Sequence, residues 1–597
     1  MTRQQPRPHP HAIAQGVWGI QPGRREIAAP PQPVAFHSHP WLASVGLIGL
    51  AATVIAYLCW YIAVYAVFIA DDAYIHMRIA QHLTEHGQPF FNLGEPVAAS
   101  SSPLWLLLLS GLFAIAGPNP ALVPPLNAIL SVTCFAILVG VCSVQGRRIT
   151  AIGCAALCVI LGALHSAAIQ METPLALTLW GLSLFGLQRQ RYGLAGLAAG
   201  LAACTRYELV LWLPLATLLA PGMATRARLM ACAFAPLGAL ALFNLGYFGS
   251  LLPNTVKAKS VIYTLSVGES LFTSGFVFGT DVFLVTIALG GVIALMLIRD
   301  IRTRIAGTAL LFGIALLGLY TARRVLVFSW YQPLYLVPAM LGLGTALTSG
   351  KRGQVALAVL VTVLLMWLPA RLAGTEAMGL VTGQALAFRE AKPGLRVHRY
   401  VQIGEELYRN YPDAVLMSSE IGGLGWGFKG RIADAAGLIS PEFLRYHPLP
   451  VPEGRSSGLA GAIPPQAVRD AAPDLLVSME TFSEAVRHEI ARGRLPSYHL
   501  LRREPVLDEQ LIPGTSGLSL WNARYTEIYV HTRLAAAAAQ PRTGPHPPLR
   551  CSVSGGYTPR PPHTPPPYPL PLQGRGPEYG VAVRQLRWRT ATPTPYP

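Results

Sequence analysis

The chain has 597 residues, of which 52% are hydrophobic and only 13% are charged. A soluble domain carries about 25% charged residues, so this composition excludes an ordinary soluble protein and favours a membrane protein with repeated apolar helices. The formal net charge of +17 does not indicate a nucleic-acid partner, because the basic excess lies largely in short loops and in the tails, as the positive-inside rule predicts.

Residues 1–40 are rich in Pro, His and Arg and are predicted to form a disordered cytoplasmic N-terminus. Residues 41–370 form the predicted transmembrane module. Its apolar runs are separated by short basic clusters such as Arg147-Arg148 and Lys351-Arg352, all of which we place in the cytoplasm. The crossings are then 43–69, 121–144, 149–167, 174–188, 193–205, 209–220, 229–248, 276–297, 305–320, 327–347 and 353–370, about eleven in all, with residue 371 outside.

One apolar segment, Pro103–Gly117, is too short to fit this series. If it crossed the membrane, every later basic cluster would move to the outside. We therefore interpret it as a re-entrant or interfacial segment.

The part of the chain after the last crossing differs in composition. In residues 371–534, short apolar runs alternate with polar turns that contain Gly, which is typical of a small α/β domain, here on the outer, periplasmic face. Residues 535–597 are dense in Pro, Gly, Thr and Arg and are predicted to be a disordered tail. The predicted fold class is therefore an α-helical polytopic membrane protein with a small C-terminal α/β domain.

Two adjacent carboxylates, Asp71 and Asp72, follow directly on the nearly uncharged segment Trp41–Ala70. Acidic side chains are costly to hold near hydrocarbon, so acids at the mouth of a membrane helix are candidate functional residues. They open the predicted outer loop 71–102.

The predicted topology brings further charged residues to the same face. Two arginines among them, Arg323 and Arg324, lie on the outer side against the positive-inside rule and therefore suggest an anionic ligand. The other charged residues at the outer tips are Glu172, Arg206, Glu208, Lys257 and Lys259.

Several of these outer segments carry short motifs, which we list in chain order. They are Asp71–Ala80 (DDAYIHMRIA), Phe91–Glu95 (FNLGE), Ser101–Trp105 (SSPLW), Gln170–Thr173 (QMET), Thr205–Glu208 (TRYE), Leu252–Lys259 (LPNTVKAK), Gly422-Gly423 and Asp434–Leu438 (DAAGL). Together they resemble the motifs of one family of GT-C membrane glycosyltransferases, the mycobacterial terminal arabinofuranosyltransferases and their proteobacterial relatives. Tyr207 departs from that pattern, because the relatives have Pro there, and Pro96–Ala99 lacks an Arg and a Glu.

The resemblance implies an enzyme of the bacterial inner membrane with its active site facing the periplasm. Such an enzyme takes a sugar from a polyprenyl-phosphate donor, passes it to a hydroxyl of a glycan or lipid acceptor and inverts the anomeric centre. The donor sugar is a pentofuranose by analogy only. The partners implied are the lipid-linked donor, the acceptor and the bilayer.

This chemistry assigns roles to the acids. The acceptor hydroxyl must lose a proton as it attacks, so a carboxylate serves as general base. Neighbouring helical residues diverge by about 100°, so the two acids cannot share one role. Asp71 is the favoured base, with Asp72 close behind. Glu172 and Glu208 are expected to hold acceptor hydroxyls or to pair with nearby arginines.

The departing phosphate gains negative charge, which cations stabilise. Arg78 lies two helical turns after Asp71, on the same face, and is expected to bind the phosphate or to orient Asp71. Two aromatic residues, Trp330 and Tyr331, are interpreted as part of an interfacial belt or as a sugar-stacking surface. The other predicted phosphate-binding residues are Arg206, Lys257, Lys259, Arg323 and Arg324.

Two alternatives stay open. A divalent metal is conceivable near Asp71 and Asp72, but the sequence shows no complete ligand set, so we predict no cofactor. The second alternative is a transporter or flippase of lipid-linked sugars or polymers. Carriers usually show repeat symmetry between halves; the sequence shows none, and its charges gather on one side, which favours catalysis.

Overall fold

The computed structural model describes residues 40–143, 148–263, 265–349, 351–449 and 462–534. The chain divides into two units, residues 1–49 and 50–597, and the described part of the first unit is the beginning of helix α1 (Pro40–Tyr65). The predicted tail, 535–597, and the predicted N-terminal segment up to residue 39 lie outside the described residues.

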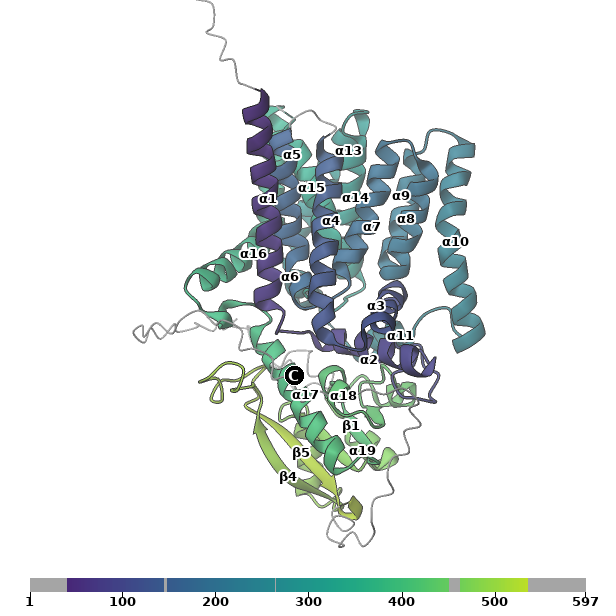
Figure 1. The fold of residues 1–597 in the computed structure, drawn as a ribbon, viewed down its shortest axis with the longest axis vertical. Helices are drawn as coiled ribbons and strands as arrows, with labels where there is room; N and C mark the ends of the chain where they lie inside the picture. The colour runs from purple at the N-terminus through teal and green to yellow at the C-terminus, as the bar shows by residue number, and fades with distance from the viewer. Residues whose placement is uncertain (1–39, 144–147, 264, 350, 450–461, 535–597) are drawn as a thin grey trace, which may run out of the picture. The chain divides into compact units, whose positions relative to one another are not determined.

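Each predicted crossing coincides with helical structure (Figure 1). The helices that follow α1 up to residue 381 are α2 (Asp71–His86), α3 (Pro103–Ala116), η1 (Pro120–Leu122), α4 (Val123–Ser143), α5 (Arg148–Cys158), η2 (Val159–Ala163), α6 (Leu164–Ala168), α7 (Thr173–Gln188), α8 (Tyr192–Thr205), η3 (Tyr207–Leu211), α9 (Trp212–Leu219), α10 (Met223–Phe248), α11 (Asn254–Ile262), α12 (Val267–Thr273), α13 (Thr280–Arg299), α14 (Arg304–Ala322), α15 (Pro333–Leu347) and α16 (Arg352–Val381).

Six helices in the described part of the chain are long and apolar enough to cross a membrane. They are Val45–Tyr65, Pro120–Cys142, Met223–Phe248, Thr280–Arg299, Arg304–Ala322 and Arg352–Val381. The remaining predicted crossings are shorter helices packed among them, for example α7 against α8 and α14 against α15. The chain is therefore a multi-pass helical membrane protein.

The predicted outer loop 71–102 is helical in its first half, which differs from a plain loop. Helix α2 begins at the acid pair and ends at His86, and the following Gly87 caps it with a positive φ of 68°. The two carboxylates lie in its first turn, where negative charge is favourable to the helix dipole.

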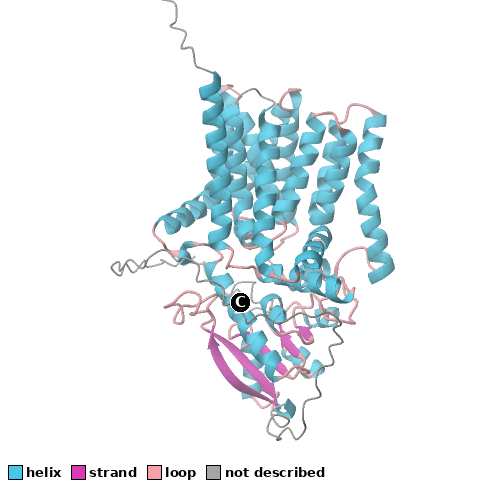
Figure 2. Cartoon of the chain, viewed as in Figure 1, coloured by secondary structure: helices cyan, strands magenta, loops and turns pink. Residues whose placement is uncertain are grey.

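The C-terminal part forms a small α/β domain, which confirms the predicted fold class. Its sheet has the order β2-β1-β3-β5-β4, in which β1, β2 and β3 are parallel and β4 and β5 run antiparallel to their neighbours. Figure 2 shows that the strands gather in this domain. Its elements are η4 (Ala385–Ala387), α17 (Ala391–Asn410), β1 (Leu416–Ser418), α18 (Gly422–Gly427), β2 (Ile432–Asp434), η5 (Pro441–Tyr446), α19 (Pro465–Ala471), β3 (Leu475–Met479), α20 (Glu484–Ala491), β4 (Tyr498–Pro505) and β5 (Tyr525–His531).

Several of the sequence motifs join this domain to the segments that follow the membrane helices. The Asn92 amide group donates to the carbonyl oxygen of Ile432 and accepts from its amide (2.8 and 3.1 Å). The Asn254 side chain donates to the carbonyl oxygens of Gly437 and Leu438 (2.7 and 2.8 Å). Two motifs that are distant in sequence therefore act as tethers, and they hold the domain against α2 and α11.

Candidate active site

A cavity of about 730 Å³ lies where α2 and α11 meet the C-terminal domain. That volume is in the range of small-ligand sites. Three groups of residues line it. The first is Phe68–Asp72 with Ile75; the second is Lys259, Ile262, Tyr263, Leu326, Phe328, Ser329 and Trp330; the third, from the C-terminal domain, includes Glu390, Arg396, Glu420, Ala436, Leu438, Glu480, Arg487 and Trp521.

Asp71 lies at the contact between α2 and the first turn of α18. Its two carboxylate oxygens accept the backbone N–H groups of Gly422 (3.0 Å) and Gly423 (2.9 Å). Burial raises the pKa of Asp71, and this outweighs the lowering effects of Arg396 and of the two amides. The carboxylate is thus held in one orientation beside the cavity, with a higher proton affinity than an exposed Asp.

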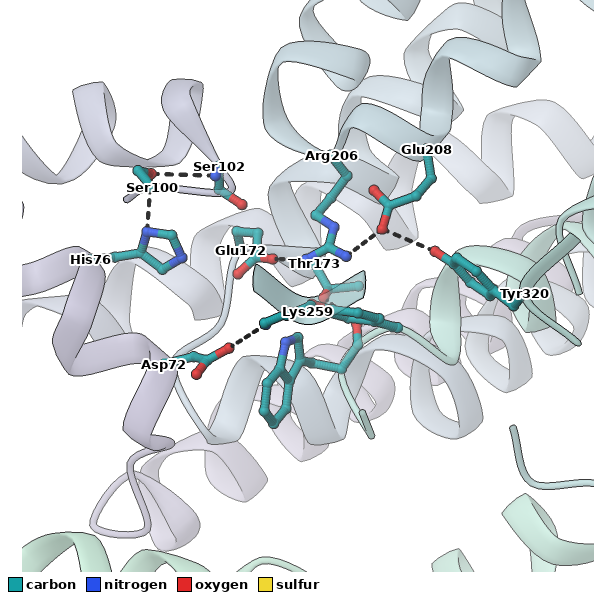
Figure 3. Close-up of polar contacts among 12 residues, drawn as sticks. Asp72, His76, Ser100, Ser102, Glu172, Thr173, Arg206, Glu208, Lys259 and Tyr320 are labelled. Atoms are coloured by element: carbon teal, nitrogen blue, oxygen red, sulfur yellow. Dashed lines mark hydrogen bonds and ion pairs between the residues drawn. The ribbon is translucent and has the colours of Figure 1, made fainter. Parts of the chain in front are cut away.

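Asp72 forms an ion pair with Lys259 in the cavity wall. The ammonium nitrogen of Lys259 lies 3.1 Å from Asp72 Oδ2 and 3.1 Å from the hydroxyl oxygen of Tyr331 (Figure 3). Burial lowers the pKa of Lys259, but Asp72 and Tyr331 outweigh it, so the pKa lies above its usual value. Lys259 is therefore a fixed positive charge within the cavity wall.

Glu172, Arg206 and Glu208 form an ion triad, in which Glu172 and Arg206 are buried and the Glu208 side chain is 24% exposed. Arg206 donates to Glu172 (2.8 Å) and to Glu208 (2.5 Å), which also accepts the Tyr320 hydroxyl at 3.0 Å (Figure 3). Glu172 is fully buried, and none of the three charged residues lines the cavity. The structure thus shows the pairing that the sequence left open for the two glutamates, and it does not place Arg206 as a phosphate ligand.

Tyr331 connects this triad to the cavity. The Arg206 guanidinium carbon lies 3.9 Å from the centre of the Tyr331 ring, while the Tyr331 hydroxyl accepts from Lys259. Trp330 lines the cavity, stacks on Phe328 at 4.8 Å, and its carbonyl accepts the Thr173 hydroxyl at 2.7 Å. Of the two predicted aromatic residues, Trp330 is thus the one in the cavity wall.

The other predicted phosphate ligands lie elsewhere. The Arg78 guanidinium is buried and donates to the carbonyl oxygens of Phe91, Gly425, Phe428 and Gly430, so it has a docking role instead. The side chains of Lys257, Arg323 and Arg324 are exposed and do not line the cavity. The structure therefore does not bring these residues into the cavity with Asp71 and Asp72, because sequence position does not indicate the direction of a side chain.

Sequence reasoning missed the charged residues that the C-terminal domain contributes. Arg396 and Glu420 form an ion pair in the cavity wall. A signal for Arg396 exists in the sequence, because Tyr400, Ile403 and Leu407 follow it at helical spacing and place it on the buried face of α17. A buried charge on an apolar helix face indicates a special environment.

The described residues contain no cluster of three or more His, Cys, Asp or Glu side chains suited to hold a metal ion. At the end of the cavity formed by α2 and α11, the groups available for chemistry are the carboxylates of Asp71 and Asp72, the second of them ion-paired with Lys259. The C-terminal domain adds further acids and the cations Arg396 and Arg487 to the lining.

Gly422→Ala is expected to disrupt this site, because a Cβ at Gly422 would lie 1.8 Å from the carbonyl oxygen of Asp71. Overpacking of this kind costs about 1–3 kcal/mol, so we expect a lower melting temperature and loss of whatever activity depends on Asp71. Gly517→Ala is the matched control, since its Cβ would meet open space. Equal thermal unfolding of the two variants would contradict the tight α2–α18 contact.

No protein-family model matches the chain, and no curated protein sequence is significantly similar to it. Solved structures with a distant likeness include ArnT from Cupriavidus metallidurans in the apo state, at 12% identity and a TM-score of 0.45, covering 82% of this chain and 99% of that chain. The same protein bound to undecaprenyl phosphate has 12% identity and a TM-score of 0.42, covering 85% and 100%. The archaeal oligosaccharyltransferase AglB from Archaeoglobus fulgidus, in complex with an inhibitory peptide and a dolichol-phosphate, has 11% identity and a TM-score of 0.43, covering 75% and 71%.

Proposed function

We propose that this chain is a GT-C-type glycosyltransferase of the bacterial inner membrane. It transfers a sugar from a polyprenyl-phosphate donor to a hydroxyl of a glycan or lipid acceptor on the periplasmic side, with inversion of the anomeric carbon. The observation that supports this most directly is the meeting of Asp71, Asp72 and Lys259 in one cavity at the end of the membrane helices. A pentofuranose donor remains a proposal by analogy.

In the proposed reaction, the acceptor oxygen bonds to the anomeric carbon while the bond between that carbon and the phosphate oxygen breaks. The hydroxyl proton passes to a carboxylate, and the leaving group is the polyprenyl phosphate. Asp71 suits the role of base because two backbone amides fix its orientation and its raised pKa increases its affinity for the proton.

Lys259 suits the phosphate side of the reaction. It is held by Asp72 and Tyr331 beside Asp71's helix, and a preorganised cation stabilises the charge that develops on the leaving phosphate. In this proposal Asp72 positions Lys259, whereas Asp71 accepts the proton, so the two adjacent acids have different roles.

This division of roles predicts a pH dependence. The base must be ionised, so kcat/KM should rise with pH through the pKa of Asp71, which burial raises above its usual value. Asp72 also raises the pKa of Asp71. In Asp72→Asn the acidic limb of the profile should therefore move to lower pH, together with a lower maximum rate.

Asp413→Asn is the matched control for this profile, because Asp413 is exposed and does not line the cavity. A profile of Asp72→Asn that coincides with the wild type on its acidic limb would contradict the coupling of the two acids.

The experiment that tests the function uses purified protein in lipid nanodiscs. A panel of synthetic farnesyl-phosphoryl pentofuranoses and hexoses is offered with a panel of alkyl glycosides as acceptors, and product is detected by mass spectrometry. Glycoside product formed by the wild type and lost in Asp71→Asn supports the proposal. If the lipid-linked sugar moves between the leaflets of proteoliposomes and no sugar is transferred, the glycosyltransferase proposal fails and the transporter alternative is supported.

A further inference from the structure

The wall of the cavity that belongs to the C-terminal domain has no role in the mechanism above. It contains Arg396 from α17, Glu480 and Arg487 from the segment after β3, and the turn residues Trp521 and Asn522. It thus combines a large aromatic ring with groups that donate and accept hydrogen bonds.

Trp521 occupies a strained position. Trp521 and Asn522 have φ values of 50° and 65°, between Leu520 and Ala523, whose backbones exchange two hydrogen bonds of 2.9 Å. A two-residue hairpin turn with two positive φ angles strongly prefers Asn-Gly or Asp-Gly. A bulky residue in this conformation raises the free energy of the folded state, and such strain clusters at functional sites.

The surrounding structure holds this turn in place. The Thr481 hydroxyl donates to the Trp521 carbonyl at 3.3 Å, and the Glu480 carboxylate accepts the Arg524 amide. The Phe482 ring lies 6.3 Å from the Trp521 ring. Trp521 is nevertheless 52% exposed while it lines the cavity, so a large aromatic residue is fixed in an accessible position.

Arg396 lies next to the indole. Its guanidinium carbon is 5.1 Å from the centre of the Trp521 ring, and the residue is only 3% exposed. It pairs with Glu420, whose second oxygen accepts the Tyr400 hydroxyl at 2.9 Å, but Arg396 Nε has no hydrogen-bond partner among the described residues. Buried donors are nearly always hydrogen-bonded in folded proteins, so this unsatisfied donor marks the Arg396 guanidinium as a candidate contact for a bound water or ligand.

We infer that Trp521 and Arg396 form a subsite for the acceptor sugar, so that the acceptor is a glycan whose ring stacks on the indole and whose oxygens accept from the guanidinium. An aromatic face provides a large apolar surface at low entropic cost, and a few convergent polar groups fix orientation. This inference rests on the proposed function, since it names the acceptor class for the same cavity.

The test compares sugar binding and stability in nanodiscs free of glycoside detergents. The probes are methyl glycosides of common pyranoses and furanoses and their disaccharides, with glycerol as a hydroxyl compound without a ring, and contact is read by saturation-transfer-difference NMR. The variants are Trp521→Asn, Trp521→Ala and Trp521→Phe. Trp367→Ala is the matched control, because Trp367 is 51% exposed but does not line the cavity.

We expect at least one glycoside, and not glycerol, to contact the wild type. Trp521→Asn and Trp521→Ala should weaken its binding about five- to tenfold, as loss of an aromatic contact does, whereas Trp521→Phe and Trp367→Ala should retain most of it. Trp521→Asn should also melt at or above the wild-type temperature, because Asn accepts a positive φ more readily. A tryptophan with only a structural role would not give a variant that binds glycosides more weakly while it keeps or gains thermal stability.

Two results would overturn the inference: no glycoside contacts the wild type, or Trp521→Asn binds glycosides as the wild type does. A fall in melting temperature in both Trp521→Asn and Trp521→Ala, parallel to the loss of binding, would also overturn it. If glycosides bind through Trp521 but no donor yields product, the glycosyltransferase proposal fails while the sugar subsite stands.

Discussion

Asp71→Asn is expected to lower kcat by about 10²- to 10⁴-fold, the usual contribution of a positioned general base. The donor should still bind, because Asp72 and Lys259 on the phosphate side are unchanged. The measurement is single-turnover transfer from a farnesyl-phosphoryl sugar, together with the dissociation constant of that donor. The acidic limb of the pH profile should disappear in the residual activity.

An amide at position 71 also changes the contact with α18, because Asn cannot accept from both Gly422 and Gly423 with its two terminal atoms. Thermal unfolding therefore accompanies the kinetics, and Gly422→Ala shows what loss of the contact alone does. If the kcat of Asp71→Asn stays within a few-fold of the wild-type kcat, Asp71 is not the base, and Asp72 becomes the favoured candidate.

Arg206→Met is expected to destabilise the protein by about 3–5 kcal/mol, because it leaves the fully buried carboxylate of Glu172 and the partly buried carboxylate of Glu208 without their cation. The measurement is thermal or denaturant unfolding in nanodiscs. Arg323→Met is the matched control, since Arg323 is exposed, and should leave stability unchanged.

A triple variant separates the charge effect from the loss of packing. Arg206→Met combined with Glu172→Gln and Glu208→Gln should recover part of the lost stability, because neutral amides are less costly to bury unpaired than carboxylates. If Arg206→Met keeps its stability and instead loses donor binding, Arg206 is a phosphate ligand after all, as the sequence suggested.

The stability prediction concerns Arg206 and the activity prediction concerns the cavity acids and Lys259, because tertiary packing gives these charged residues different partners. Lys259 and Arg206 look equivalent in the sequence, as basic residues at outer tips. In the folded chain, Lys259 projects into the cavity beside Asp72, whereas Arg206 is enclosed by two glutamates and the Tyr331 ring. A charged side chain takes its role from its partners, and these come from other helices.

The apolar runs by themselves determined that this is a helical membrane protein, because a membrane helix needs only its own residues to satisfy its backbone. The abrupt end of the first run likewise identified Asp71 and Asp72 as candidate site residues. Only the tertiary structure decided which cations face them and brought Arg396 and Trp521 into the same cavity wall from more than 300 residues away. Those contacts depend on how the C-terminal domain docks through Asp71, Asn92 and Asn254. Local patterns in the sequence mark some of these residues, but they do not show which residue pairs with which across such long-range contacts.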